Sequence, residues 1–283
     1  MKPLPPAAVA LLACPVCVQP MAGVDGHRGL RCAAGHAFDR ARQGYVTLLS
    51  SGAGPPPGDT AAMVADRVAF LGSGAFAGVT RALGDAVLAG ERPAALLDLG
   101  GGTGHHLAAV LARVPDAVGV VLDSSRYAAR RAAAASDRIV AVIADAWGRL
   151  PIRDAALDRV LGVFAPRNGA ETARVLRSGG RLVVVTPAAD HLAELVGPLR
   201  LLRVDPDKEA RLAGSLAPHL DPCGATVHRE VLALSHAAVA VLVGMGPHAH
   251  HVDPAELAAR IAQLPDPVSV TIAVQVSGWS RRP

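Results

Sequence analysis

The sequence is poor in aromatic residues and almost free of lysine. Aromatic side chains make up 3% of its 283 residues, and lysine occurs only at Lys2 and Lys208, so arginine supplies nearly all of the positive charge. No apolar run reaches the roughly 18 residues that a bilayer-spanning helix requires, so we expect a cytoplasmic chain with no membrane partner. The net charge of +4 permits a nucleic-acid partner without requiring one.

Cysteine is scarce as well, and its placement argues against a disulfide framework. Three of the four cysteines lie in the first 32 residues, as Cys14-Pro-Val-Cys17 and Cys32, and His36 follows Cys32 after three residues. A Cys-x2-Cys pair facing a Cys-x3-His pair supplies three thiolates and one imidazole, the ligand set of a tetrahedral zinc site. Because protein groups fill all four positions, we predict a structural Zn²⁺ site formed by Cys14, Cys17, Cys32 and His36. His27, in a glycine-rich turn between the pairs, is a weaker candidate.

Residues 1–49 are predicted to form a zinc-binding RNA-recognition module. So short a segment cannot bury enough surface to fold unaided, so metal binding would provide its folding energy. The sequence allows two interpretations of the surface of this module. Either its arginines contact RNA phosphates while Phe38 and Tyr45 stack on bases, or these aromatic rings pack inside the module. The arginines in question are Arg28, Arg31, Arg40 and Arg42.

The rest of the chain alternates between strand-like and helical patterns. Residues 50–58 are rich in Gly, Pro and Ser and are predicted to be a linker to a domain at 59–283. Helical patterns cover 59–71 and 76–88. We expect strands at 94–99, 117–123, 138–144, 157–164, 181–186, 227–234 and 268–276. Such alternation predicts an α/β fold with a seven-stranded, doubly wound, Rossmann-like sheet of class I type. The histidine tract at 248–251 is interpreted as a loop.

A glycine-rich turn is the most informative motif of the chain. Asp98 ends an apolar strand, and Leu-Gly-Gly-Gly-Thr-Gly104 leads into a helix, which lets the backbone approach a ligand closely. A dinucleotide fingerprint would need glycine where His105 stands, so the spacing favours S-adenosylmethionine (AdoMet). Asp123, at the end of the next strand, is expected to accept the ribose hydroxyls, and Asp145 to face the adenine. A tight turn with ordinary polar caps is the alternative.

Together these motifs resemble a known family. The zinc pattern is followed by Phe38-Asp39, Gly44-Tyr45-Val46 and Leu48-Leu49, then by Gly58-Asp59-Thr60 and the glycine turn. The combination resembles the bacterial large-subunit ribosomal RNA guanine-N1 methyltransferases that carry a zinc module. Three further motifs are similar to the actinobacterial branch that protects producers of tylosin-like macrolides: Gly100-Gly-Gly-Thr-Gly-His-His106, Phe164-Ala-Pro-Arg-Asn168, and Thr186-Pro187 with His191-Leu192.

The resemblance implies methylation of N1 of a guanine in a 23S rRNA hairpin near the peptide exit tunnel. It also implies that Gly102, Thr103 and His191 contact AdoMet. Phe76 stands where relatives have a tyrosine that contacts the cofactor, so its hydroxyl is missing here. The full set of expected cofactor-binding residues is Phe76, Asp98, Gly100, Gly102, Thr103, Gly104, His105, Asp123 and His191.

Catalytic groups are harder to assign. Guanine N1 carries a proton at neutral pH, so a base must remove it or the protein must stabilise negative charge at O6. Asp145, Arg167 and Asn168 are the candidates for contact with the base. The other titratable groups expected nearby are His106, His191 and Glu194. A small-molecule methyltransferase and a non-catalytic RNA-binding protein are the alternative functions, and a homodimer is compatible with the sequence.

Overall fold

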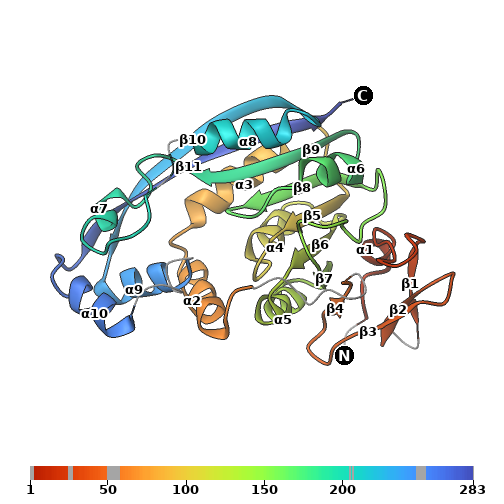
Figure 1. The fold of residues 1–283 in the computed structure, drawn as a ribbon, viewed down its shortest axis with the longest axis horizontal. Coiled ribbons are helices and arrows are strands. Elements are labelled where there is room, and N and C mark those ends of the chain that lie inside the picture. The colour runs from red at the N-terminus through yellow and green to blue at the C-terminus, as the bar shows by residue number, and fades with distance from the viewer. Residues whose placement is uncertain are drawn as a thin grey trace.

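The computed structural model describes residues 3–24, 28–49, 58–203, 205, 207–246 and 253–282. His27, nearly all of the predicted linker at 50–58, and the histidine tract at 248–251 lie outside the described residues. A large mixed sheet runs through the molecule, and a small antiparallel sheet lies beside it near the N-terminus (Figure 1).

Five parallel strands form the centre of the large sheet. They are rich in Val, Leu and Ile and almost wholly buried, as strands covered on both faces must be. Along the sheet they follow the order β7-β6-β5-β8-β9, so successive strands are added on one side of β5 as far as β7 and on its other side from β8 onward. The strands are β5 (Ala95–Leu99), β6 (Val118–Asp123), β7 (Ile139–Ile143), β8 (Leu157–Val163) and β9 (Leu176–Pro187).

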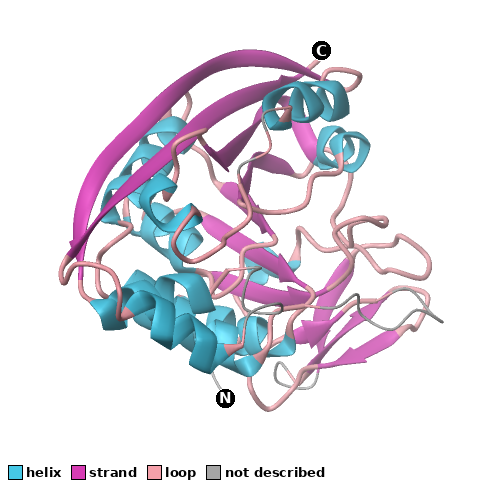
Figure 2. Ribbon diagram, turned by 60° about the vertical axis from the view of Figure 1, so that its left-hand side comes forward, coloured by secondary structure: helices cyan, strands magenta, loops and turns pink. Residues whose placement is uncertain are grey.

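Two long antiparallel strands complete one side of this sheet. β11 (Val268–Arg281) pairs with β9, and β10 (Leu220–Leu234) pairs with β11 at the edge. Figure 2 shows them as a long curved ribbon along one side of the molecule. All seven predicted strands are therefore present, and the predicted doubly wound α/β fold is confirmed.

An eighth strand was not expected. β4 (Val46–Thr47) joins the opposite edge and runs parallel to β7. A two-residue strand carries no periodic pattern, so only the folded structure reveals it.

Helices cover both faces of the large sheet. α2 begins after Thr60, which caps the helix because its hydroxyl accepts the Met63 N–H at 3.3 Å. In the part of the chain that the structure describes, no single helix has the length and apolar character of a membrane span. The helices around the sheet are α2 (Ala61–Gly72), α3 (Ala77–Leu88), α4 (His105–Ala112), α5 (Arg126–Ala135), α6 (Gly169–Val175), α7 (Ala193–Val196), α8 (Lys208–Leu216), α9 (His236–Gly244) and α10 (Pro254–Ile261).

The N-terminal region shares its core with the large sheet. A short helix, α1 (Pro6–Val9), precedes the small sheet of β1 (Met21–Val24), β2 (Gly29–Cys32) and β3 (Ala37–Asp39). Buried side chains of this region, such as Leu12 and Leu30, belong to the same apolar cluster as Leu97 and Val120 of the central strands. The metal region is therefore packed onto the large sheet.

Candidate functional site: two adjoining cavities and a metal centre

The first cavity lies where the central strands reverse their order, at the carboxyl ends of β5 and β6. Ligands of doubly wound sheets bind at this point. The cavity has a volume of about 320 Å³, and the loop between β5 and α4 forms one of its walls. Gly100 has a φ of +65°, and a Cβ there would lie 2.8 Å from the Cβ of Ala165, so only glycine fits. The sharp turn predicted from the glycine motif is present.

Asp98 is the unusual group of this cavity. Its carboxylate oxygens are fully buried, and neither has a hydrogen-bond partner at good geometry among the described residues. Burial, followed by the charge of Asp123, raises the pKa of Asp98 to about 7, although the nearby N–H of Leu107 opposes the shift. A buried acid without a partner is costly. The structure therefore offers a place for a ligand that brings positive charge and N–H groups.

Asp123 ties the glycine loop to the end of β6. Its carboxylate accepts the N–H of Gly102 at 2.9 Å through one oxygen and the N–H of Ser125 at 2.8 Å through the other. Burial raises the pKa of Asp123, while these two hydrogen bonds lower it. Each oxygen retains a lone pair, so the carboxylate can still accept hydroxyl groups from a sugar.

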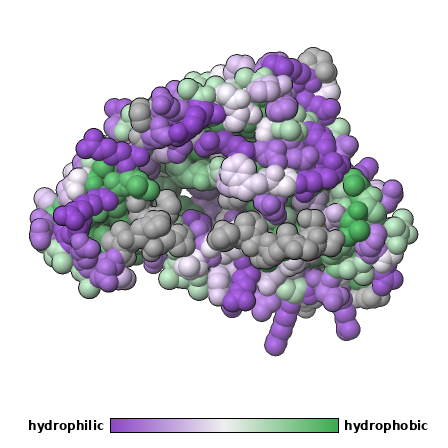
Figure 3. All heavy atoms as spheres, in the orientation of Figure 1, coloured by the Kyte–Doolittle hydropathy of each residue, from purple (hydrophilic) through white to green (hydrophobic). Residues whose placement is uncertain are grey.

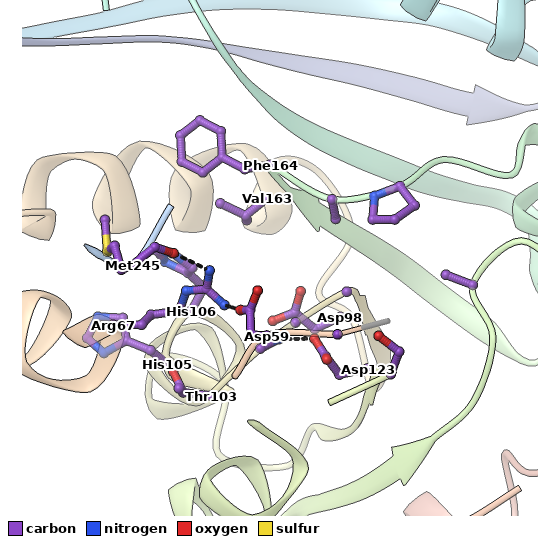
Figure 4. A pocket seen from close by; sticks show the side chains of 18 of the residues that line it. Asp59, Arg67, Asp98, Thr103, His105, His106, Asp123, Val163, Phe164 and Met245 are labelled. Carbon is purple, nitrogen blue, oxygen red and sulfur yellow. Dashed lines mark hydrogen bonds and ion pairs between the residues drawn. The ribbon is translucent and has the colours of Figure 1, made fainter. Parts of the chain in front are cut away.

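Arg67, on α2, also lines this cavity. Its guanidinium forms an ion pair with Asp59 and donates a hydrogen bond to the carbonyl of Met245 at 2.8 Å. Figure 4 shows Asp59, Asp98 and Asp123 near one another, with Arg67 beside them. The sequence analysis missed Arg67, because one arginine in an otherwise ordinary helical pattern gives no signal of its position.

The donor set fits AdoMet. The buried carboxylate of Asp98 suits the ammonium and sulfonium charges, Asp123 suits the ribose, and the glycine loop permits close approach. The predicted residues that line the first cavity are Phe76, Asp98, Gly100, Gly102, Thr103, His105, Asp123 and Asp145. Gly104 and His191 are not among its lining residues. Gly104 instead precedes α4 in a left-handed conformation and packs against Ala132.

A second cavity of about 540 Å³ adjoins the first. The two share Arg67, Phe76, Phe164 and Met245 as lining residues. The ring of Phe164 lies 6.5 Å from that of Phe76 and 5.9 Å from that of His191, so aromatic rings line the passage. Figure 3 shows one face of the molecule hollowed near its centre.

His191 and Arg167 line this second cavity. The Nδ1 of His191 accepts the N–H of Ala273 at 3.2 Å, which leaves the ring proton on Nε2. Burial lowers the pKa of His191 to about 4, so its ring is neutral at physiological pH. His191 is therefore a hydrogen-bond donor through Nε2 and a poor base.

The other titratable candidates are weak bases too. Burial, aided by His105 and Arg67, lowers the pKa of His106 to about 3, and its Nδ1 lies 3.1 Å from the hydroxyl of Thr80. The carboxylate of Glu194 accepts the N–H of Thr271 at 2.9 Å, and its hydrogen bonds to Thr271 outweigh burial and lower its pKa.

Asp145 lies in the wall of the first cavity, whereas Asn168 is not among its lining residues. Asp145 also accepts the N–H of Trp147 at 2.9 Å. The Asn168 side chain accepts the N–H of Glu171 at the start of α6 and donates to the carbonyls of Trp147 and Gly148. Its amide thereby holds the loop after β7 against α6. Trp147, which the sequence analysis did not single out, is 64% exposed at the rim.

The four predicted metal ligands meet at one point. Their ligand atoms all lie within 4.8 Å of one another, with 3.6 Å between the sulfurs of Cys17 and Cys32 and 3.4 Å from Cys32 Sγ to His36 Nδ1. Zn–S bonds of about 2.3 Å in a tetrahedron place sulfurs about 3.8 Å apart, so the spacing suits zinc. All four cysteines of the chain are free thiols.

The structure shows how the two aromatic residues of this region, Phe38 and Tyr45, are packed. Phe38 and Tyr45 are half-buried and pack against the two apolar clusters of the molecule. Arg28, Asp39, Arg40 and Arg42 line an open surface hollow nearby.

The doubly wound sheet, the ligand-binding turn after its central strand and the Cys3His centre together define a class I AdoMet-dependent methyltransferase that carries a zinc ribbon. Residues 12–51 match the family model described as "RlmA, N-terminal", a zinc ribbon. The 23S rRNA (guanine(748)-N(1))-methyltransferase of Streptomyces fradiae is 50% identical over 270 residues, covering 94% of this chain and 95% of the relative. A Micromonospora griseorubida protein assigned by name to the 23S rRNA (guanine-N(1)-)-methyltransferases is 51% identical over 287 residues, covering 95% and 96%. The chain belongs to this family of 23S rRNA guanine-N1 methyltransferases.

Solved structures with a similar fold are more distant. A methyltransferase in complex with the Haloferax volcanii Trm112 activator has a TM-score of 0.48 and 17% identity, covering 80% of this chain and all of that one. A geranyl diphosphate methyltransferase in complex with SAM has a TM-score of 0.47 and 14% identity, covering 81% and 97%.

Proposed function

We propose that this protein transfers a methyl group from AdoMet to N1 of one guanine in a hairpin of 23S rRNA. The guanine is the one equivalent to position 748 in the name of the Streptomyces fradiae relative. One observation carries the proposal: a cavity suited to AdoMet opens into a second cavity with aromatic, apolar and cationic walls. Such a cavity suits a purine base that has left its RNA stack.

The residues divide the work between the two cavities. Asp98 and Asp123 hold the amino acid and ribose parts of AdoMet, which supplies an electrophilic methyl group when bound. Phe164 stacks on the guanine, and the Nε2–H of His191 donates a hydrogen bond to it. Much of the catalysis then comes from holding N1 in line with the methyl group in a site with little water.

The tentative catalytic residues have distinct roles in this proposal. Arg167 faces the base and stabilises charge at O6. Asn168 is a positioning residue, because its amide is engaged in holding the loop after β7. Asp145, which lines the first cavity, is the carboxylate beside the adenine.

The zinc ribbon contributes to RNA binding in this proposal. Arg31 on β2 and Arg28 in the turn directly before β2 are exposed, and they can pair with phosphates at some distance from the reacting base. A cytoplasmic location follows from a ribosomal substrate. A homodimer, which would add RNA-binding surface, is tested by measuring the mass of the protein in solution.

The experiment is primer extension on 23S rRNA from cells with and without the protein. A methyl group on N1 blocks Watson–Crick pairing, so reverse transcriptase should stop next to the guanine equivalent to position 748. Resistance of the expressing cells to tylosin-like macrolides would extend the proposal to drug protection.

A small-molecule substrate is the competing possibility. Labelled AdoMet incubated with rRNA and, separately, with a metabolite extract distinguishes the two. Label confined to metabolites would reject the RNA proposal.

A further inference from the structure

Two of the cationic side chains that line the second cavity, those of Arg167 and Lys208, form no ion pair with any residue that the structure describes. Arg167 lies between β8 and α6, and its Nε is buried without a hydrogen-bond partner among the described residues. Lys208 is the first residue of α8 and lines the same cavity. Burial, followed by the charge of Arg167, lowers the pKa of Lys208, so the two charges sense one another.

The remaining charges around this cavity are already compensated or exposed. Asp205, the acid that lines it, forms an ion pair with Arg211. Arg67 is paired with Asp59, and His191 is neutral. Arg203 is exposed at the rim. Two cations held together in a partly apolar cavity thus have room for a negative charge from a ligand.

Proton removal from guanine N1 creates such a charge. When N1 loses its proton, the electron pair is shared with O6, which becomes negative. None of His106, His191 and Glu194 is an effective base at neutral pH, for the reasons given above. The chain therefore has a stronger means of stabilising the deprotonated guanine than of removing its proton.

Resting on the proposed function, we propose that Arg167 and Lys208 together bind O6 of the target guanine and make its N1 more acidic. The N1 proton passes to water. The electron pair left on N1 then forms a bond to the methyl carbon, and the electrons of the breaking C–S bond pass to sulfur. The products are neutral N1-methylguanine, neutral S-adenosylhomocysteine and one proton, and the charge on O6 is gone.

A phosphate is the other anion that RNA offers, but the cavity fits it less well. Leu192, Val196, Leu201 and Leu242 make much of the wall, and the aromatic ring of Phe164 faces the same space. A flat base gains contacts with these apolar and aromatic groups, whereas a phosphate has no apolar face and gains nothing from them. Phosphate contacts are expected instead from exposed arginines such as Arg203.

The test compares Lys208→Met with Lys208→Arg and with Arg203→Met, which removes an exposed charge from the rim of the same cavity. The kcat and KM for a 23S rRNA hairpin transcript are measured from about pH 6 to about pH 9. Near neutral pH, Lys208→Met should lose roughly 100- to 1,000-fold in kcat, in line with the loss of one group that stabilises an oxyanion. Its rate should recover at higher pH, because N1 then loses its proton without help.

Lys208→Arg should retain most of the rate, and Arg203→Met should leave the pH profile unchanged. The affinity for AdoMet, measured by calorimetry, should not change in any of these variants. Lys208→Gln provides a second charge-removing variant should the methionine form fold poorly.

A rise in KM with a weaker salt dependence and an unchanged pH profile would identify a phosphate contact and overturn the inference. An unaltered kcat in Lys208→Met would overturn it as well. Failure of the wild-type protein to methylate N1 would instead refute the proposed function, so the two failures are distinguishable.

Discussion

At the scale of single residues, Asp98 links the binding of AdoMet to pH. Its pKa of about 7 means that the carboxyl group is largely protonated in mildly acidic solution. A cationic ligand prefers the ionised form, so AdoMet affinity should fall as the pH drops below about 7. In Asp98→Asn the side chain keeps its shape without the charge, so calorimetry should show weak binding that no longer varies with pH.

Asp98 also links the stability of the protein to pH, but in the opposite direction: a higher pH favours AdoMet binding and lowers the stability of the cofactor-free protein. An acid whose pKa is raised by folding holds a proton that the unfolded chain releases, so the stability of the cofactor-free protein falls as the pH rises from about 4 to about 7. Asp98→Asn should therefore melt at a higher temperature than wild type at mildly alkaline pH and differ little near pH 5. A lower melting temperature at alkaline pH would contradict this account of the buried charge.

At the scale of elements, the loop between β5 and α4 needs glycine for two separate reasons. Gly100 has a positive φ, and its missing Cβ leaves room for Ala165. Gly100→Ala should cost about 1–2 kcal/mol from the left-handed conformation alone, and more from the collision. We expect AdoMet binding, measured by calorimetry, to be lost or strongly weakened.

Gly179→Ala is the matched control for this loop. Gly179 also has a positive φ, of +75°, but nothing lies within 4 Å of a Cβ placed there. This variant should show the backbone cost in its melting temperature and bind AdoMet normally. Equal effects of the two substitutions on AdoMet affinity would mean that Gly100 has no special place in the pocket.

At the scale of the whole molecule, the zinc ribbon and the large sheet share one apolar core. Leu12 and Leu30 pack in the same cluster as the central strands, and β4 extends the sheet itself. Loss of zinc is therefore expected to weaken the molecule as a unit. Cys17→Ala should lose metal by elemental analysis and lower the single melting transition by about 10 °C, a few kcal/mol for a domain of this size.

Cys223→Ala is the control for cysteine removal, because Cys223 is exposed and lies outside the metal centre. It should retain one zinc per chain and melt like wild type. Two separate transitions in Cys17→Ala, with the larger one unchanged, would show that the ribbon folds independently of the sheet.

The sequence by itself determined the features whose partners are close along the chain. The zinc ligands sit in pairs with two and three residues between their members, the glycine turn occupies seven consecutive positions, and the buried strands contain short apolar runs. Spacing and periodicity carry such information because local backbone geometry turns a regular sequence pattern into a helix, a strand or a turn.

Only the tertiary structure decided that Arg67 lines the cofactor cavity, that His191 lines the adjoining one, and that Lys208 lines the same cavity as Arg167, 41 positions away in the sequence. The positions of these residues relative to one another depend on how the helices pack onto the sheet. Burial in the folded protein then sets whether each titratable group is charged, so no local sequence pattern predicts its charge.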